Sequence, residues 1–455
     1  MPEAFAGYPA PFVHDQPGGR KVQQLLWGDW LELSGESQDD WVEVSKARNA
    51  SGWMRSSDIG SDRLLEINFV DVGQGDGCLV VTPDDRRILI DAGRQDNMSN
   101  YLRWRFNLRN RPDSRLRIDA ALISHPDSDH YEGFGPLLDD EQIEIGTLYH
   151  TGLVDHAESP RLGPTETVGA VTYYTELFAS MPDLADALPR LDPGESMHYP
   201  GLLRTALSTG RVDDIRSLSS RDEELPEFSS DDLRIEVLGP VTESVGDKFA
   251  LRRLGADDIT KNGHSIVVML CFGAARFLLG GDLNQAAMEF LLQHYGEDLD
   301  PDSSQSVFRA DVAKACHHGS ADVSTDFVAR INAIATVVSS GDNESYSHPR
   351  PDALGILGKH GRGERPLIFS TELARSAREE RAGVSLSGAI RELAPRTADE
   401  VERAIAVYGM ITVRSDGTNV VMAQKLERPT GFGTSWDVHC LEQGPDGLHY
   451  NSAAG

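Results

Sequence analysis

The stretch ISHPDSDH, residues 123–130, follows an apolar run and indicates the class of fold. Four side chains that can bind a metal ion, His125, Asp127, Asp129 and His130, fall within six residues at the end of a predicted strand. Such a turn can aim His125 and Asp127 to one side and Asp129 and His130 to the other, which suits two adjacent cations. The alternative is a solvated turn with Asp129 as a helix N-cap, but so dense a cluster is costly unless a cation neutralises it.

Two later stretches fit the same kind of site. RFLLGGD at 276–282 reads as a buried strand ending in Asp282, although that aspartate alone is equally consistent with a helix cap. VAKACHHGS at 312–320 reads as another strand, ending in His317 and His318. Adjacent histidines at a strand end favour metal ligation, whereas the preceding Cys316 is expected to be a buried strand cysteine.

Strands alternate with helical stretches over most of the chain, which indicates an α/β domain. Its first strands are predicted at 65–72, 78–81 and 87–92. The predicted units are residues 1–62, an α/β domain at 63–427, and a turn-rich C-terminal extension at 428–455 to which no function is assigned.

Two segments of the α/β domain are predicted insertions. Residues 151–232 are rich in acidic residues, Ser and Pro, with a helix expected at 168–180. Residues 373–407 have helical character broken at Pro395.

Composition limits the function classes. The 455 residues hold 43 Lys and Arg against 72 Asp and Glu, so the net charge of −29 argues against broad adhesion to nucleic acid or anionic lipid. No apolar run is long enough to span a bilayer, and the start lacks the features of a secretory signal. The four cysteines are scattered without a CxxC pair, so a cytoplasmic, reducing setting and no membrane association are expected.

The first sixty residues contain four of the six tryptophans, Trp27, Trp30, Trp41 and Trp53. Short alternating strands separated by polar turns suit a small β-barrel with buried aromatics. The order GDWLEL, DDWVEV and SGWM resembles a bacterial SH3-like domain. That resemblance implies either a packing module or a docking site for a protein partner, and the sequence leaves both open.

The larger domain resembles the metallo-β-lactamase superfamily, and in particular the branch found in ComEC-type DNA-uptake channels. The resemblance is carried by the ordered series FVDVGQGDG, LIDAG, SHPDSDH, NGHSIVV, FLLGGD, CHHGS and SHP over residues 64–372, and it resumes at 408–417. It implies an αββα sandwich, preceded here by the SH3-like β-barrel, with metals at one edge between the two sheets. One departure is Glu132, which stands where the family has a glycine.

The resemblance also implies residue roles. Asp127 replaces the usual second histidine of the first motif, and Asp91 matches an aspartate that orients a loop without binding metal. No clear counterpart of the separate third-motif histidine is found, and His150 and His264 are the nearest candidates. The implied metal ligands are His125, Asp127, Asp129, His130, the bridging Asp282, and His317 in preference to His318, which would be a proton donor or second-layer group. The expected catalytic residues are Asp129, Asp282 and His318. Ser320 and His348 are expected to contact substrate.

This ligand set predicts two divalent cations. An aspartate in place of an imidazole shifts the preference from Zn²⁺ alone toward Mn²⁺ or Mg²⁺. Two cations clamp the attacking and leaving oxygens of an in-line displacement, which favours phosphodiester cleavage. Ser320 and the amides around Gly319 are placed to hold a phosphoryl oxygen.

An arginine-rich segment joins two of these motifs. Arg103, Arg105 and Arg109 are followed by three more arginines at 111, 115 and 117, with Tyr101 and Trp104 interleaved. Arginines can track a phosphate backbone while aromatic rings stack on bases. The equally weighted alternative is a surface helix whose arginines pair with acidic neighbours while the aromatics pack inward.

The sequence therefore predicts a metal-dependent phosphodiesterase, a nuclease acting on DNA and recruited by a partner through the SH3-like domain. A second hypothesis is a metallohydrolase of a small molecule, such as a cyclic nucleotide, a lactone, a thioester or a β-lactam, because fold alone does not choose a substrate. A third, a non-catalytic binding module, is disfavoured by the retained aspartates and histidines. Oligomeric state is not predicted.

Overall fold

The computed structural model describes residues 3–48, 50–230, 232–297, 305–341, 347–371, 410–430, 434–445 and 447–450. The helical character predicted for 373–407 lies outside these residues. The mixed α/β architecture predicted from the alternating pattern is confirmed. None of the described helices is long and apolar enough to cross a membrane.

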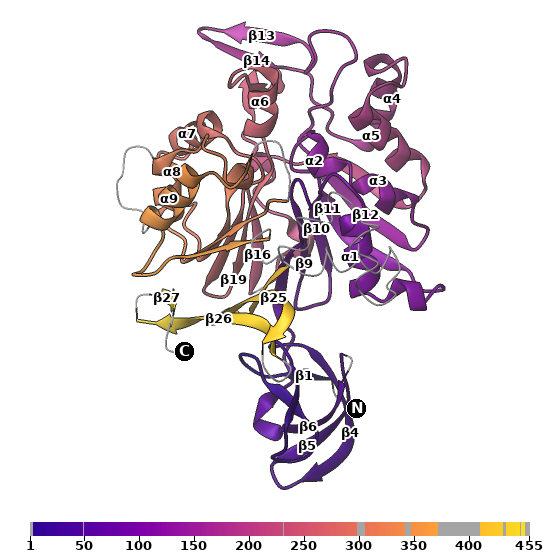
Figure 1. The fold of residues 1–455 in the computed structure, drawn as a ribbon. Coiled ribbons are helices and arrows are strands. Elements are labelled where there is room, and N and C mark those ends of the chain that lie inside the picture. The colour runs from indigo at the N-terminus through magenta and orange to yellow at the C-terminus, as the bar shows by residue number, and fades with distance from the viewer. Residues whose placement is uncertain are drawn as a thin grey trace.

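Two β-sheets form the centre of the molecule (Figure 1). In spatial order the ten-stranded sheet comprises β15 (Val212–Ser217), β12 (Ile143–His150), β11 (Leu116–Leu122), β10 (Arg87–Ala92), β9 (Gly77–Val81), β8 (Leu65–Phe69), β24 (Ile411–Ser415), β25 (Val420–Thr430), β26 (Thr434–Gly444) and β27 (Gly447–Tyr450). The six-stranded sheet comprises β16 (Leu233–Gly239), β19 (Val267–Phe272), β20 (Ala275–Leu279), β21 (Val312–Lys314), β22 (Ala335–Val338) and β23 (Leu367–Ser370).

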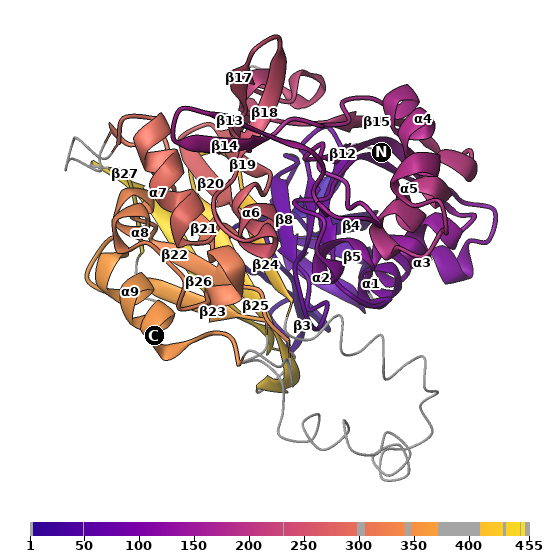
Figure 2. The ribbon, with the colours of Figure 1, turned by 90° about the horizontal axis from the view of Figure 1, so that it is seen from above.

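Helices cover the outer faces of the two sheets (Figure 2). Beside the ten-stranded sheet lie α1 (Asn97–Arg105), α2 (Ser128–Tyr131), α3 (Phe134–Asp139), α4 (Met181–Leu191) and α5 (His198–Ser208). Beside the six-stranded sheet lie α6 (Asp257–Gly263), α7 (Gln285–His294), α8 (Thr325–Ile331) and α9 (Pro351–His360).

Three apolar cores define the layers. One joins the ten-stranded sheet to α1, α3, α4 and α5, a second lies between the two sheets, and a third joins the six-stranded sheet to α7 and α8. All five residues of β8 are buried, as expected for a strand covered on both faces. The layer order is therefore helix, sheet, sheet, helix, and the carboxyl ends of strands from both sheets face one edge.

The predicted insertion differs from expectation in one element of secondary structure. Instead of the helix predicted at 168–180, β13 (Thr165–Val168) and β14 (Val171–Tyr174) form a hairpin there. Strand β14 pairs with β18 (Lys248–Arg252), which pairs in turn with β17 (Glu243–Val245). The run of Val, Thr and two Tyr in β14 favours a strand. The helix begins only at Met181, where the Ser180 side chain caps the backbone N–H of Asp183.

Strands also replace the turns expected near the C-terminus. Residues 434–444 and 447–450 form β26 and β27, which extend the ten-stranded sheet beyond β25 by antiparallel pairing. Leu441 and Leu448 are buried in the core between the sheets. This segment therefore contributes to the core of the α/β domain.

The N-terminal residues form a separate antiparallel sheet of seven strands. Their spatial order is β3 (Lys21–Gln24), β2 (Phe12–His14), β6 (Ala50–Arg55), β5 (Trp41–Ala47), β4 (Trp30–Gln38), β1 (Ala4–Ala6) and β7 (Ile59–Gly60). The strands predicted around Trp41 and Trp53 are confirmed. The sheet keeps two edges, β3 and β7, and its core is largely aliphatic, while Trp30 is 47% exposed. These strands therefore do not confirm the predicted small SH3-like β-barrel.

A buried ion-pair network joins this sheet to the α/β domain. Arg414 of β24 reaches Asp29 with Nη1 at 2.9 Å and Glu66 with Nη2 at 2.8 Å, and all three side chains are buried. Arg48 also pairs with Asp29 at 2.7 Å, and Arg105 with Glu66 at 3.1 Å. Burial alone would raise the pKa of Glu66, but the guanidinium groups of Arg414 and Arg105 outweigh it and lower the pKa to about 2.

We predict that Arg414→Met lowers the free energy of unfolding by about 3–5 kcal/mol, because it leaves the buried carboxylates of Asp29 and Glu66 without their shared cation. Urea titration of the full chain measures this change. The control is Arg20→Met, which removes an arginine whose side chain is 68% exposed. An equal effect of both substitutions would contradict the role assigned to the network.

We predict a matching dependence on pH. The folded pKa of Glu66 is about 2, below its ordinary value of 4.5, so its contribution to stability is present above about pH 4.5 and is lost as the pH falls toward about 2. Glu66→Gln should therefore flatten the fall in stability on acidification. Urea titrations at a series of acidic pH values measure this slope, and the exposed Glu36→Gln is the control, expected to leave the slope unchanged.

Candidate metal centre

Polar side chains converge where strands of both sheets end. The first half of the domain contributes Asp76 from the turn between β8 and β9, Asp91 from β10, His125 and Asp127 after β11, and Asp129 and His130 from α2. The second half contributes Asp282 after β20, Lys314 at the end of β21, and His318 from the short 3₁₀ turn Cys316–Gly319.

His130 is held at both ring nitrogens. Its Nδ1 lies 2.8 Å from Asp91 Oδ2, and its Nε2 lies 3.2 Å from Asp282 Oδ2. Asp91 also accepts the backbone N–H of Ser124 at 2.7 Å, so it fixes both the ring and the loop that carries His125. Burial would lower the pKa of His130, but the two carboxylates raise it well above its usual range. Asp91 thus aims His130 Nε2 at Asp282.

His318 approaches the same carboxylate from the other sheet. Its Nε2 lies 3.1 Å from Asp282 Oδ2 and 3.8 Å from Asp129 Oδ2. Its Nδ1 lies 3.0 Å from the carbonyl of Ser339 and 3.2 Å from Asp76 Oδ1. Burial opposes protonation, but Asp282 and Asp76 raise the pKa of His318 to about 10.

His125 completes the imidazole group. Its Nδ1 lies 3.0 Å from Ser124 Oγ, while its buried Nε2 has no hydrogen-bond partner. Burial, followed by the neighbouring His130, lowers the pKa of His125 to about 4, so the ring is neutral. A neutral imidazole with a free nitrogen is the form that binds a metal ion.

Asp76 and Lys314 also belong to this site, although neither is predicted as a site residue from the sequence. Lys314 Nζ forms an ion pair with Asp76, donates to the carbonyl of Gly281 at 2.7 Å, and lies 3.4 Å from Asp282 Oδ1. Burial would raise the pKa of Asp76, but Lys314 and His318 lower it to about 2. The signal for Asp76 is a carboxylate within a glycine-rich turn at a strand end. No sequence signal pairs it with Lys314.

The donor set fits a divalent cation. Four groups of ligand atoms in the described residues lie within 4.8 Å of one another: His125, His130 and Asp282; Asp129, His130 and His318; Asp76, Asp282 and His318; and Asp76, Asp91 and His130. The Nε2 atoms of His125, His130 and His318 are buried and lack a partner of good hydrogen-bond geometry. Imidazole nitrogens and carboxylate oxygens are ligands for Zn²⁺ and Mn²⁺, so these residues can hold such an ion.

Other predicted residues lie outside these groups. The ring of His317 is 5.7 Å from that of His348, and His318, not His317, contacts Asp282. Ser320 Oγ accepts the backbone N–H of Asp322 at 3.2 Å. Asp127 pairs with Lys261, with 2.5 Å between Oδ1 and Nζ.

Neither candidate for the third-motif histidine joins the cluster. His264 Nε2 lies 2.7 Å from the carbonyl of Arg252, and burial lowers the pKa of its ring to about 4. His150 is fully buried, and burial alone lowers the pKa of its ring to about 4. The first metal position is the one beside His125 and Asp127. Neither His150 nor His264 supplies a further imidazole there.

The arginines of α1 and the following turn are engaged with neighbours. Arg103 lies 2.6 Å from the buried Asp140, Arg105 pairs with Glu66, and Arg109 donates to Asn100 at 3.3 Å. Tyr101 is completely buried. This arrangement favours the alternative of paired arginines and inward aromatics over an open groove.

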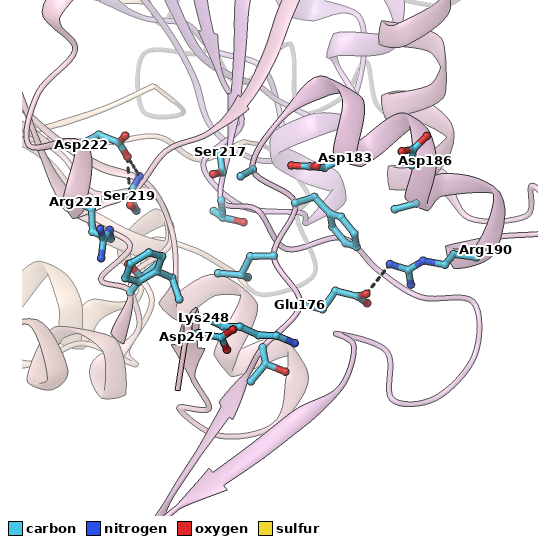
Figure 3. A pocket seen from close by; sticks show the side chains of 18 residues that line it. Glu176, Asp183, Asp186, Arg190, Ser217, Ser219, Arg221, Asp222, Asp247 and Lys248 are labelled. Carbon is cyan, nitrogen blue, oxygen red and sulfur yellow. Dashed lines mark hydrogen bonds and ion pairs between the residues drawn. The ribbon is translucent and has the colours of Figure 1, made fainter. Parts of the chain in front are cut away.

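A separate cavity of about 710 Å³ lies beside α4 and the β17–β18 hairpin (Figure 3). Its lining mixes cations such as Arg190 and Lys248 with acids such as Asp183 and Asp186, and Arg190 pairs with Glu176 at 2.5 Å. None of the predicted metal ligands lines it, so its size does not identify it as the reaction site.

Comparison with known proteins agrees with this geometry. The family model described as the metallo-beta-lactamase superfamily matches residues 71–176, which include the first four predicted ligands. This match and the His/Asp cluster support a metallohydrolase of the β-lactamase superfamily as the class of protein.

One curated relative is ComE operon protein 3 of Bacillus subtilis (strain 168), with 23% identity over 309 residues. The aligned part is 65% of this chain, and the chain spans only 31% of the relative.

Among solved structures, a metal-dependent hydrolase of the β-lactamase superfamily has 13% identity and a TM-score of 0.32, covering 67% of this chain and 95% of that one. A long form of RNase Z from yeast has 10% identity and a TM-score of 0.28, covering 72% of this chain and 44% of that one. Both TM-scores are too low to establish a shared fold.

We predict that the adjacent histidines separate in function. His318→Ala should weaken Mn²⁺ or Zn²⁺ binding by at least about 10-fold, the lower bound typical even for groups one step removed from a metal. His317→Ala should leave the affinity within a factor of about 2, because its ring lies beside His348 and not beside Asp282. Isothermal titration of each variant measures both values, and the reverse order would contradict the assignment of His318 as the ligand.

Proposed function

We propose that the protein is a metal-dependent phosphodiesterase and that DNA is its substrate. The observation that carries the proposal is the buried Asp282 Oδ2, which two imidazole Nε2 atoms approach from opposite halves of the domain at 3.2 and 3.1 Å. Such a convergence of two imidazole nitrogens on one carboxylate oxygen is suited to a cation. We propose Mn²⁺, Zn²⁺ or Mg²⁺ as the occupant.

The chain's own residues then have distinct roles. Asp91 orients His130, and Lys314 orients Asp76 and Asp282 from behind. Asp129 is 19% exposed, more than Asp76, Asp91 or Asp282, so it is placed to accept a proton from an attacking water. A bound divalent ion supplies Lewis-acid activation of the phosphoryl group and of water.

The motif series and the curated relative support a DNA substrate only through resemblance to the ComEC-type branch. A specific observation favours the second candidate, a hydrolase of a small phosphodiester. Arg103 and Arg105, the cations that would track a polymer backbone, are paired with Asp140 and Glu66, and the whole chain carries a net charge of −29. Polymer binding would then need a positive surface elsewhere.

We predict that purified protein cleaves single-stranded or plasmid DNA with Mn²⁺, and that Asp282→Ala reduces cleavage to the level of the buffer control by removing the shared carboxylate. The assay also includes RNA and bis-p-nitrophenyl phosphate, each with Mn²⁺, Mg²⁺ or Zn²⁺. Asp186→Ala, an exposed change in the separate cavity, is the matched control and should retain full activity.

The outcomes separate the candidates. Cleavage of the small ester alone, lost in Asp282→Ala, would move the assignment to a small-molecule phosphodiesterase. Absence of hydrolysis together with absence of bound metal would overturn both.

A further inference from the structure

Helix α6 supplies two partners to Asp127, the aspartate that stands where the family has a histidine. Lys261 Nζ lies 2.5 Å from Asp127 Oδ1. The amide of Asn262, oriented with its nitrogen toward its acceptors, donates to Asp127 Oδ2 at 2.8 Å and to the carbonyl of Asp258 at 3.1 Å. Both oxygens of Asp127 are therefore engaged by consecutive residues of one helix.

Because both oxygens of Asp127 are engaged, fewer ligand atoms are free to bind a cation at the first metal position, between His125 and Asp127. The only imidazole adjacent to Asp127 within the ion pairs of the described residues is His125, whose Nε2 lies 3.8 Å from Asp127 Oδ2. A cation bound between them would lie close to the Lys261 ammonium, and like charges at short range in a buried site repel strongly. His264 is committed to the carbonyl of Arg252, so it does not complete the position.

The neighbouring position differs in its number of imidazoles and in its outer carboxylate, Asp129. Asp129, His130 and His318 offer ligand atoms within 4.8 Å of one another, and Asp282 Oδ2 lies beside both imidazoles. The ion pairs of the described residues include none between Asp129 and a lysine or arginine. This position thus has four candidate ligands and no ammonium on Asp129. Lys314 lies 3.4 Å from Asp282 Oδ1, whereas both imidazoles contact the other oxygen, Oδ2.

We propose that Lys261 is a positioning residue that occupies Asp127 and restricts the centre to one divalent ion, held by Asp129, His130, Asp282 and His318. Lys261 supplies at the first position the positive charge that a second ion would bring. Its side chain is 18% exposed. The proposal that the Lys261 charge replaces a second ion in catalysis rests on the proposed phosphodiesterase function. The number of bound ions does not depend on which substrate is cleaved.

The test counts ions directly. Full-length protein is stripped with chelator, loaded with Mn²⁺, freed of excess metal, and analysed for manganese per chain. Wild type is expected to hold one ion, Lys261→Met two, and the charge-conserving Lys261→Arg one. Lys261→Gln provides a second neutral variant should the methionine variant fold poorly, and the exposed Lys46→Met in β5 is the matched control, expected to hold one.

Electron paramagnetic resonance gives a second readout that requires no activity. Wild type should show an isolated Mn²⁺ spectrum, and the neutral variants of Lys261 a spin-coupled pair. Two ions in wild type, or one ion in both neutral variants, would overturn the proposal while leaving the proposed function intact. No ion in any variant would overturn the metal centre itself and the proposed function with it.

Discussion

The contact of two imidazoles with one oxygen of Asp282 is the interaction on which the site depends. His130 comes from the half of the domain built on the ten-stranded sheet, whereas Asp282 and His318 come from the half built on the six-stranded sheet. The two halves meet through the apolar core between the sheets, which brings these strand ends to one edge. The packing of that core therefore sets the distances between ligands that come from different sheets. A change in this packing would move the ligands relative to one another.

Charge balance follows from this arrangement. Five carboxylates gather around the site, Asp76, Asp91, Asp127, Asp129 and Asp282, and two ammonium groups, Lys261 and Lys314, pair with three of them. The imidazoles adjust to what remains: carboxylates raise the pKa of His130 and His318, while burial lowers that of His125. A buried carboxylate cluster that recruits protons onto its imidazoles is a site that accepts a metal cation in their place.

The parts of this arrangement that can be predicted from the sequence are the local ones. The α/β class, the strands leading to the motifs, and the local clustering of Asp129 and His130 follow from apolar runs that end in ligand-type residues, whereas the place of Asp282 beside them is what the family resemblance implies. Relations across the fold are not predictable: Lys314 reads as an ordinary strand residue until β21 lies beside β20. His317 and His318 cannot be told apart, because positive φ angles of 49° and 53° turn both side chains out of the strand alternation. The hairpin at 165–174 is not predicted, because the helix prediction follows overall composition and gives too little weight to the β-branched and aromatic residues of β14.

The arginine segment shows why composition alone is a poor guide to a binding surface. Glu66 lies at the start of β8, whereas Asp76 follows the end of that strand at the metal centre, so Arg105 acts at the far end of the sheet. There it joins Glu66, Arg414 and Asp29 in the network beneath the N-terminal sheet. Of the basic residues that suggest a nucleic-acid track, Arg105 instead neutralises an acid buried between two parts of the chain, and Arg103 pairs with the buried Asp140. A surface that guides substrate must therefore be built from other residues, and Lys261, which pairs with Asp127 and is 18% exposed, is a cation at the edge of the metal centre.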